Sequence, residues 1–463
     1  MIIKKNVSYK DRSFIALTDD TRVIESLLKG EGDKFGLQKD TDTDKVLFVK
    51  NKQNKNFITP QIAQSCSMVE SYELNDILMA NFSHNSPNIV GITGTNGKTT
   101  TAAIIYSILL DLGFNVALLG TRGFFINEHR IKPKGLTTPS MLELYENLCI
   151  AMEQKCNFFI MEVSSHAIEQ ERIAGLDFAL KILTNITSDH LDYHKSVEEY
   201  RRIKNSFFEG EGRKLLNADE PYIYCTDKAA YFYGIEKKGN LSVDVYALEN
   251  GIDGYISWRE RDYKTNEQSA IQAHLYGKHN LYNTLAAIGA VKILTQEPLE
   301  RIAEALEHFG GVSGRMEVVH NMPLVIVDFA HTYDGMYQIF ESFRHCKIAV
   351  VFGAGGDRDK SKRPKMGACA QQFAHKIYIT SDNPRTESPK SIIEDILSGM
   401  QDGEYVFVEA DRKKAIYMAL ESLESDEVLL ILGKGDEDYQ IIGNEKIYFD
   451  DREVVRNYFA SCT

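Results

Sequence analysis

Hydrophobic and polar positions along the chain follow the spacings of strands and helices, and they divide the chain into three regions. In the first region, which ends near residue 88, short apolar runs at 13–17 and 46–49 read as strands, and the stretch 50–56 is polar and charged. The segment 81–87 has the composition of a linker. We therefore predict a small N-terminal α/β domain.

The second region alternates buried strands with helical patterns. Its apolar runs read as strands at 88–90, 116–119, 158–162 and 180–184. Residues 101–112 carry apolar side chains on one helical face, so a helix follows the first of these strands. This alternation is typical of a mostly parallel sheet in an α/β domain. The segment 241–276, with turn residues at 250–254, is predicted to add an antiparallel edge.

A second alternation begins after the glycine-rich segment 310–314. Its predicted strands are 324–329, 347–352, 376–380 and 428–432. The pattern favours a Rossmann-like domain, and open sheets of this kind place their ligands at the loops that follow the strands. The predicted domains are 1–88, 89–313 (a P-loop ATPase-like domain) and 314–463.

Composition narrows the class of protein. A chain of 463 residues exceeds what one hydrophobic core normally supports, which favours about three domains. The formal net charge of −13 argues against a nucleic-acid partner. The seven cysteines form no C-x-x-C pair, which is the pattern of a protein in a reducing compartment that holds no metal cluster. No apolar run predicts a signal peptide or a membrane span. We expect a cytoplasmic monomer whose partners are small molecules, with neither nucleic acid nor membrane among them.

The segment from Gly91 to Thr100 reads Gly-Ile-Thr-Gly-Thr-Asn-Gly-Lys-Thr-Thr and joins a strand to a helix. Backbone N–H groups of such a turn point at phosphate oxygens, while Lys98 supplies positive charge and Thr99 a hydroxyl for Mg²⁺. The spacing departs from the usual phosphate loop, since Ile92 stands where its first glycine is expected. A tight strand-to-helix connection is the alternative. The predicted ATP site comprises Gly94, Thr95, Asn96, Gly97, Lys98, Thr99 and Thr100.

Two further motifs follow predicted strands. Glu162 begins the sequence Glu-Val-Ser-Ser-His and would place a carboxylate near Mg²⁺, although Ser164 and Ser165 also suit a helix cap. His190 lies within Asp-His-Leu-Asp-Tyr-His and is a candidate metal ligand, although histidines in loops are commonly surface residues. With no cysteine nearby, zinc is not implied.

In this order and rough spacing, the motifs resemble the Mur ligase family from about residue 88 to the end. Further matching segments are 277–283, 314–317, 327–331, 352–359 and 433–440. The resemblance implies an ATP-dependent amide ligase of cytoplasmic peptidoglycan precursor synthesis that works through an acyl phosphate. It also implies that the domains must close around their substrates, with opening expected at the 88 and 313 boundaries.

The tetrapeptide Asp382-Asn-Pro-Arg385 resembles that of family members which add meso-2,6-diaminopimelate to the D-glutamate of UDP-N-acetylmuramoyl-L-alanyl-D-glutamate. Diaminopimelate ends in both an ammonium and a carboxylate. Arg385 suits such a substrate because a guanidinium can grip a carboxylate with two hydrogen bonds. The chain departs from the family pattern at Asp436, where relatives commonly carry histidine.

The resemblance also implies roles position by position. Diaminopimelate would be bound by Arg358, Asp382, Asn383, Pro384, Arg385, Gly433 and Glu437. The UDP-linked substrate would be bound by Thr21, Thr137, Thr138, Ser164, Gln170 and Arg172. ATP would also contact Asn283, Arg315 and Asp328. The catalytic residues would be Lys98, Glu162, His190 and Lys204, and Mg²⁺ would be held by Thr99, Glu162, His190 and Lys204.

Lys204 would be carbamylated by CO₂, which converts a cation into a carboxylate-like metal ligand. Its neighbours Arg201 and Arg202 give the same segment the pattern of a solvated helix face, so this role depends on the resemblance.

Two alternative functions remain open. A folylpolyglutamate synthetase-like ligase would share the phosphate loop but should lack the 382–385 tetrapeptide. A non-catalytic regulatory P-loop protein would bind ATP and need no amino-acid site. Clustering of Arg358, Arg385 and Glu437 in space would argue against the regulatory protein.

Overall fold

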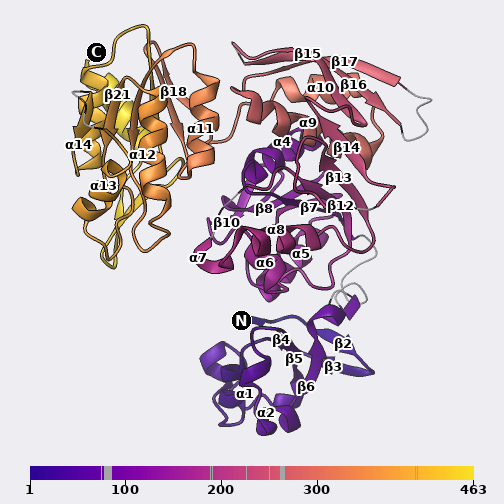
Figure 1. The fold of residues 1–463 in the computed structure, drawn as a ribbon. Coiled ribbons are helices and arrows are strands. Elements are labelled where there is room, and N and C mark those ends of the chain that lie inside the picture. The colour runs from indigo at the N-terminus through magenta and orange to yellow at the C-terminus, as the bar shows by residue number, and fades with distance from the viewer. Residues whose placement is uncertain are drawn as a thin grey trace.

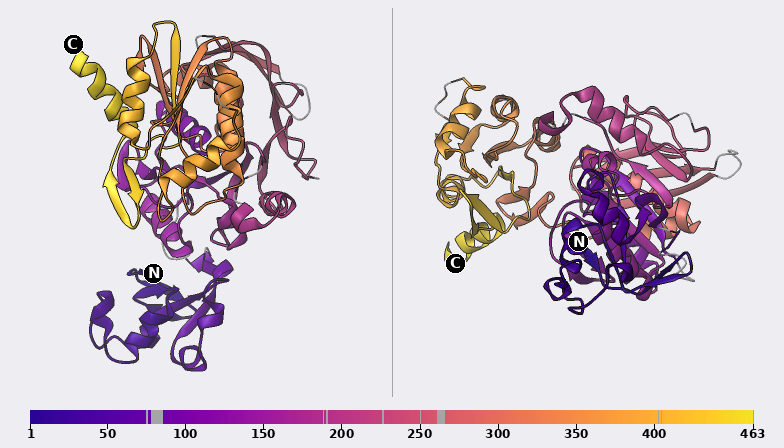
Figure 2. Two further views of the ribbon diagram at one scale, coloured as in Figure 1. Left: turned by 60° about the vertical axis from the view of Figure 1, so that its left-hand side comes forward. Right: turned by 90° about the horizontal axis from the view of Figure 1, so that it is seen from below.

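A computed structural model describes residues 1–74, 76–77, 86–187, 189, 191–225, 227–249, 251–260, 266–401, 403 and 405–462. The strands form three main sheets and two small hairpins. In Figures 1 and 2 the N-terminal body lies at one end of the central body, and the C-terminal body lies beside the central one. The predicted α/β class is confirmed; the domain boundaries stay predictions.

The N-terminal body is built on a small four-stranded sheet. Its spatial order is β1 (Ile2–Ile3), β4 (Ala16–Thr18), β5 (Val46–Lys50) and β6 (Ser67–Glu70). It also contains a separate hairpin, β2 (Val7–Tyr9) and β3 (Arg12–Phe14), and the helices α1 (Thr21–Leu27) and α2 (Pro60–Ser65). Four 3₁₀ turns connect these elements: Gly32–Phe35, Thr43–Lys45, Lys55–Phe57 and Ser71–Glu73.

The central body contains an eleven-stranded sheet. Its spatial order is β10 (His129–Lys132), β9 (Gly123–Ile126), β8 (Val116–Gly120), β11 (Phe158–Glu162), β7 (Asn88–Thr93), β12 (Phe178–Leu183), β13 (Arg213–Asn217), β14 (Tyr231–Gly234), β15 (Leu241–Ala247), β16 (Ile252–Arg259) and β17 (Asn266–Ala273). The strands from β8 to β15 pair in parallel, and both outer edges are antiparallel, which confirms the predicted edge at 241–276.

Helices cover both faces of the central sheet. Residues of α4 (Lys98–Asp111), α9 (Lys278–Thr295) and α10 (Leu299–Glu307) share one apolar cluster with inward-facing strand residues. The opposite face packs against α5 (Met141–Glu153) and part of α8 (Val197–Ser206). The short helices α6 (Ser165–Glu169) and α7 (Leu191–His194) lie beside α8 (Figure 1).

The C-terminal body is a doubly wound sheet, as predicted. Its strand order is β18 (Glu317–Asn321), β19 (Leu324–Asp328), β23 (Glu427–Leu432), β20 (Lys347–Phe352), β21 (Lys376–Ile379) and β22 (Val406–Val408). One face packs on α11 (Tyr333–Ser342), α12 (Lys362–Phe373) and α13 (Pro389–Leu397), and the other on α14 (Arg412–Glu421) and α15 (Asp451–Cys462). A hairpin of β24 (Tyr439–Ile442) and β25 (Glu445–Tyr448) precedes α15.

Two local predictions were wrong. The segment 13–17 is two strands in different sheets, because the chain leaves the β2–β3 hairpin before Ile15, whose N–H donates to the Lys45 carbonyl. The predicted turn at 250–254 ends too late, since β16 already includes Asp253 and Gly254. A Cβ on Gly254 would lie 2.5 Å from the Val245 carbonyl oxygen, so this glycine serves close strand packing; Asn250 lies outside the described residues.

The apolar core is continuous across the expected hinge near residue 88 but nearly interrupted at the expected hinge near residue 313. One cluster runs from Ile3 and Val49 of the N-terminal body to Leu148 of α5 and Phe159 of β11. This continuity argues against opening near residue 88. Of the described residues of the central body, only the part-buried Tyr276 packs against the apolar clusters of the C-terminal body. The 313 junction is therefore the better candidate for movement.

A buried ion pair fastens the last helix. Arg412 of α14 and Asp451 of α15 are both fully buried and make two hydrogen bonds, at 2.8 and 2.7 Å. Arg412 also donates to the Leu432 carbonyl, 3.0 Å away at the end of β23. The pair thus joins the last helix to the end of β23, where the loop that begins at Gly433 is predicted to bind a ligand.

Replacing Asp451 with asparagine should lower the free energy of unfolding of the C-terminal body by about 3 kcal/mol, because it leaves the Arg412 charge buried without its carboxylate. Urea denaturation followed by circular dichroism measures this loss. The exposed pair Lys390–Glu394 provides the control, and Glu394→Gln should unfold as the wild type does. An equally small effect of both changes would contradict the prediction.

Candidate active site

The phosphate loop leaves β7 and enters α4 through glycines that have no room for a side chain. A Cβ on Gly94 would lie 1.8 Å from Thr184 Oγ1, and one on Gly97 would lie 2.2 Å from Asn283 Oδ1. Gly97 also has a φ of 85°, in the left-handed region that favours glycine. Asn185 accepts the N–H of Thr95 at 2.8 Å through its backbone carbonyl. The loop is therefore a rigid turn that ends at the N-terminus of α4.

Two lysines donate to one carbonyl of this loop. Lys98 Nζ lies 2.7 Å and Lys204 Nζ 2.9 Å from the Gly94 oxygen. Lys204 is 1% exposed, which places it apart from the solvated helix face that its neighbours suggested. Burial, and then the nearby Lys98 charge, hold the pKa of Lys204 well below its usual range; burial also lowers the pKa of Lys98. Burial therefore favours the neutral form of the Lys204 amine.

Glu162 closes the other side of the loop. Its carboxylate accepts hydrogen bonds from Thr99 Oγ1 at 2.8 Å and from the Thr121 N–H at 2.9 Å. A Cβ on Gly120 would lie 2.1 Å from Glu162 Oε1, so the carboxylate rests directly on that glycine. A hydroxyl and a carboxylate at this spacing are hard oxygen donors that suit Mg²⁺.

His190, the third predicted metal ligand, lies outside the described residues. Within the described part of the chain, no group of three or more His, Cys, Asp and Glu side chains could hold a metal ion. Thr99 and Glu162 fit a Mg²⁺ ion that takes its remaining ligands from phosphate and water.

The residues predicted to hold the UDP-linked substrate form a connected set around Thr138. The Thr138 hydroxyl donates to the Glu162 carbonyl at 2.9 Å and accepts the Ser164 N–H at 3.0 Å. Arg172 donates to the Thr138 carbonyl at 2.7 Å and to Gln170 Oε1 at 2.6 Å. Thr137 Oγ1 lies 3.2 Å from Thr121 Oγ1.

Thr21 stands apart from this set, at the first residue of α1. The N-terminal body instead reaches the set through a polar segment that we did not predict as part of the site. Gln53 donates to Gln170 at 2.8 Å, and Lys52 donates to the Glu169 carbonyl at 2.7 Å. No sequence signal distinguished these two residues within the charged stretch 50–56.

The predicted nucleotide contacts lie on both sides of the 313 junction. Asn283 is buried beneath Gly97. The Arg315 guanidinium lies over the Phe329 ring, 4.3 Å from its centre. Asp328 accepts the N–H groups of Met316 and Ala330, each at 2.7 Å, and burial raises its pKa.

The predicted diaminopimelate residues meet where the strands of the C-terminal sheet end. Asn383 Nδ2 donates to Glu437 Oε2 at 2.8 Å, and the buried Lys434 lies 3.1 Å from the same oxygen. Arg385 has a φ of 52° and donates to the Gly356 carbonyl at 2.8 Å. Sequence reasoning missed Lys434, although it lies within the matching segment 433–440.

One cavity of about 570 Å³ unites residues from the two bodies. From the central body it is lined by Leu136, Thr137, Thr138, Ser164, His166, Arg172 and Asp189. From the C-terminal body it is lined by Phe329, His331, Thr332, Tyr333, Asp334, Gly355, Arg358, Asp359, Ser361, Lys362, Lys365, Asp382, Asn383, Arg385, Gly433 and Glu437. Arg358, Arg385 and Glu437 therefore cluster in space, whereas Pro384 is not among the lining residues.

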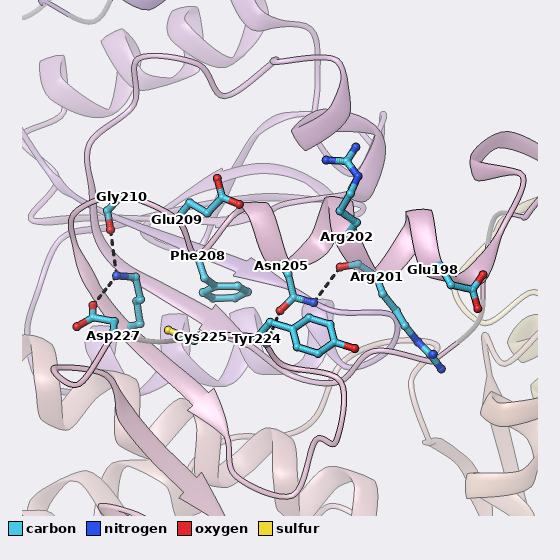
Figure 3. Close-up of a pocket in the computed structure, with 11 residues that line it drawn as sticks. Glu198, Arg201, Arg202, Asn205, Phe208, Glu209, Gly210, Tyr224, Cys225 and Asp227 are labelled. Carbon is cyan, nitrogen blue, oxygen red and sulfur yellow. Dashed lines mark hydrogen bonds and ion pairs between the residues drawn. The ribbon is translucent and has the colours of Figure 1, made fainter.

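A second hollow, of about 640 Å³, lies on α8 and the segment that follows it (Figure 3). Arg201, Arg202 and Tyr224 are among its lining residues, and two further lining residues, Lys214 and Asp227, form an ion pair. No described residue of the predicted site lines this hollow, whereas residues of both predicted substrate-binding sets line the cavity of about 570 Å³.

Comparison with known proteins agrees with this geometry. The pattern of the "Mur ligase middle domain" matches residues 92–291, and that of the "Mur ligase, glutamate ligase domain" matches residues 314–435. The UDP-N-acetylmuramoyl-L-alanyl-D-glutamate–2,6-diaminopimelate ligase of Helicobacter pylori is 52% identical over 464 residues, which cover 100% of this chain and 99% of the relative. The chain belongs to the Mur ligase family.

Two other ligases of the same name resemble this Mur ligase. The ligase of Wolinella succinogenes is 58% identical over 367 residues, covering 79% of this chain and 83% of the relative. A solved structure of such a ligase is 25% identical, with a TM-score of 0.63, and covers 95% of this chain and 99% of its own. Among the described residues, no helix of this Mur ligase is long and apolar enough to cross a membrane.

Replacing Glu162 with glutamine should reduce ATP turnover by roughly 100-fold and raise the Mg²⁺ concentration needed for half activity, because an amide retains the size but not the charge. Phosphate release across a Mg²⁺ titration measures both effects. Glu143 of α5 lies outside the site, so Glu143→Gln is the control and should behave as wild type. An unchanged Mg²⁺ midpoint in Glu162→Gln would remove Glu162 from the metal site.

Proposed function

We propose that this Mur ligase adds meso-2,6-diaminopimelate to the D-glutamate carboxylate of UDP-N-acetylmuramoyl-L-alanyl-D-glutamate, using ATP. The observation that carries the proposal is the shared cavity, in which the Thr138 and Arg172 set faces the Arg385 and Glu437 set. The relative that is 52% identical over the whole chain is named for the same reaction.

In the first step, an oxygen of the D-glutamate carboxylate would attack the γ-phosphorus of ATP, and the bond to the β-phosphate oxygen would break. The products are an acyl phosphate and ADP. The phosphate loop would hold the β- and γ-phosphates through its N–H groups, and Lys98 would leave the Gly94 carbonyl to neutralise them. When bound between Thr99 and Glu162, Mg²⁺ would counter the negative charge on the transferred group.

In the second step, the amine of the incoming amino acid would attack the acyl carbon. The tetrahedral intermediate then loses phosphate and a proton, which leaves an amide. Residues of this chain contribute by holding the amine and the acyl phosphate within reaction distance, since each substrate is bound by a different body.

Recognition of diaminopimelate depends on opposite charges at its distal end. Arg385 and Arg358 would bind carboxylates, while Glu437 and the Gly433 carbonyl would bind the ammonium. Glu437 is already hydrogen-bonded to Asn383 and Lys434, so its carboxylate is held in place before the substrate arrives. L-lysine has the distal ammonium but lacks the carboxylate that Arg385 would bind.

Lys204 carbamylation remains part of the proposal. A neutral amine is the form that adds to CO₂, with loss of one proton, and burial beside Lys98 favours that form. The carbamate would supply an oxygen ligand beside the phosphate loop, where the amine now donates to the Gly94 carbonyl.

We further propose that the enzyme is a cytoplasmic monomer that binds small molecules and neither nucleic acid nor membranes. A purely regulatory ATP-binding protein would have no use for the charged amino-acid site, so the clustering of Arg358, Arg385 and Glu437 favours the ligase.

The decisive experiment measures phosphate release with ATP, Mg²⁺ and the UDP-linked dipeptide in the presence of meso-diaminopimelate, L-lysine or no amino acid. Product masses are determined in parallel. We expect phosphate release and a tripeptide product with diaminopimelate alone. Activity with lysine instead would refute the assigned specificity, and ATP turnover independent of any amino acid would support a regulatory protein.

Replacing Arg385 with methionine should lower kcat/KM for diaminopimelate by roughly 10- to 100-fold, the value of a lost hydrogen bond to a charged group. The same steady-state assay measures it. Arg344, exposed at the end of α11, provides the matched Arg344→Met control, which should retain wild-type kinetics. Equal kcat/KM values for the two variants would exclude Arg385 from the binding site.

A further inference from the structure

Three charged residues meet where the central and C-terminal bodies face each other. Lys134 Nζ lies 2.9 Å from Asp436 Oδ2, and Arg122 Nε lies 3.8 Å from the same oxygen. Lys134 also donates to the backbone carbonyl of Asp436. We call these three residues the junction clasp.

The two cations come from the outer edge of the central sheet. Arg122 lies in the turn between β8 and β9, and Lys134 follows β10. Asp436 lies in the loop after β23, and its side chain is 13% exposed. The side chains of Lys134 and Arg122 are 30% and 33% exposed, so water is partly excluded from the pair. Partial shielding lowers the local dielectric constant and strengthens the pair relative to a fully exposed one.

The clasp joins two loops that line opposite walls of the shared cavity. Lys134 is two residues before Leu136 and three before Thr137, both lining residues. Asp436 immediately precedes Glu437, which lines the cavity from the other body. Fixing Asp436 to Lys134 therefore fixes the two substrate-binding walls relative to each other.

Arg122 indicates that the clasp has not reached its tightest form. Its Nε is buried without a hydrogen-bond partner among the described residues. The Asp436 oxygen is 3.8 Å away, which is about 0.6 Å beyond the upper limit of hydrogen-bond distance. A closing movement of about that size would convert the contact into a hydrogen bond.

The connection between the bodies permits such a movement. A Cβ on Gly310 or on Gly311 would meet no neighbouring atom within 4 Å, and Gly311 has a φ of 90°. The loop that contains Asp436 packs directly against this connection, since a Cβ on Gly314 would lie 2.0 Å from the Asp436 nitrogen. The clasp thus lies beside the segment about which the bodies would turn.

We propose that the junction clasp positions the amino-acid site against the acyl phosphate, so that Asp436, Lys134 and Arg122 promote amide formation without contacting the reacting atoms. This inference rests on the proposed function for its kinetic consequences. They are positioning residues, and their loss should slow the second step while leaving the first step intact.

The test separates the two steps in Asp436→Asn, Lys134→Met and the double variant. The first step is measured without amino acid by trapping the acyl phosphate with hydroxylamine, which displaces phosphate and gives a hydroxamate. The second is measured as tripeptide formation with diaminopimelate. We expect hydroxamate formation within about 2-fold of wild type and tripeptide formation lowered about 10-fold, mainly through KM for diaminopimelate.

The double variant shows whether Asp436 and Lys134 act through their contact with each other or independently. If Asp436 and Lys134 act together, the double variant should be no slower than either single variant. The exposed pair Lys347–Asp426, 2.7 Å apart within the C-terminal body, supplies the control variants Lys347→Met and Asp426→Asn, which should leave both steps unchanged.

X-ray scattering from the free proteins gives a readout that needs no activity. Loss of the clasp should increase the radius of gyration of Asp436→Asn relative to wild type and to Asp426→Asn. The inference is overturned if the clasp variants retain wild-type tripeptide formation and scattering, or if both steps slow by the same factor. If wild type forms no tripeptide at all, the proposed function fails, and the scattering comparison alone decides whether the clasp holds the bodies together.

Discussion

The proposed nucleotide site depends on the Gly94 carbonyl, because two lysine side chains from different helices donate to it. Lys98 begins α4 and Lys204 belongs to α8, and both amines lie within 2.9 Å of one oxygen. Two full positive charges this close in a shielded site repel each other strongly. Burial lowers the pKa of both amines, that of Lys204 to well below its usual range, which reduces this repulsion.

Much of the fold could be predicted from the sequence because the patterns are strong where strands are buried on both faces. Strands β11 and β20 begin and end where the apolar runs do. The predictions were wrong where contacts with other parts of the chain determine the local structure. The 13–17 run divides between two sheets, and Gly254 looks like a turn residue although it is needed for strand packing.

In the candidate site, too, some features could be predicted from the sequence and others could not. The phosphate loop and the carboxylate of Glu162 could be identified because their chemistry requires particular residues at particular spacings. The roles of Arg385 and Glu437 needed the family resemblance. Neither approach could find Gln53 or the pairing of Lys134 with Asp436, since these contacts join residues that are distant in sequence and whose types are common on protein surfaces.

The contact between Glu162 and Gly120 has a consequence for inhibition. Any side chain at position 120 would collide with the carboxylate proposed to hold the metal. An inhibitor resting on Gly120 would therefore contact a position that cannot gain a side chain without displacing the Glu162 carboxylate. Resistance by substitution at this position would carry a direct loss of catalytic fitness.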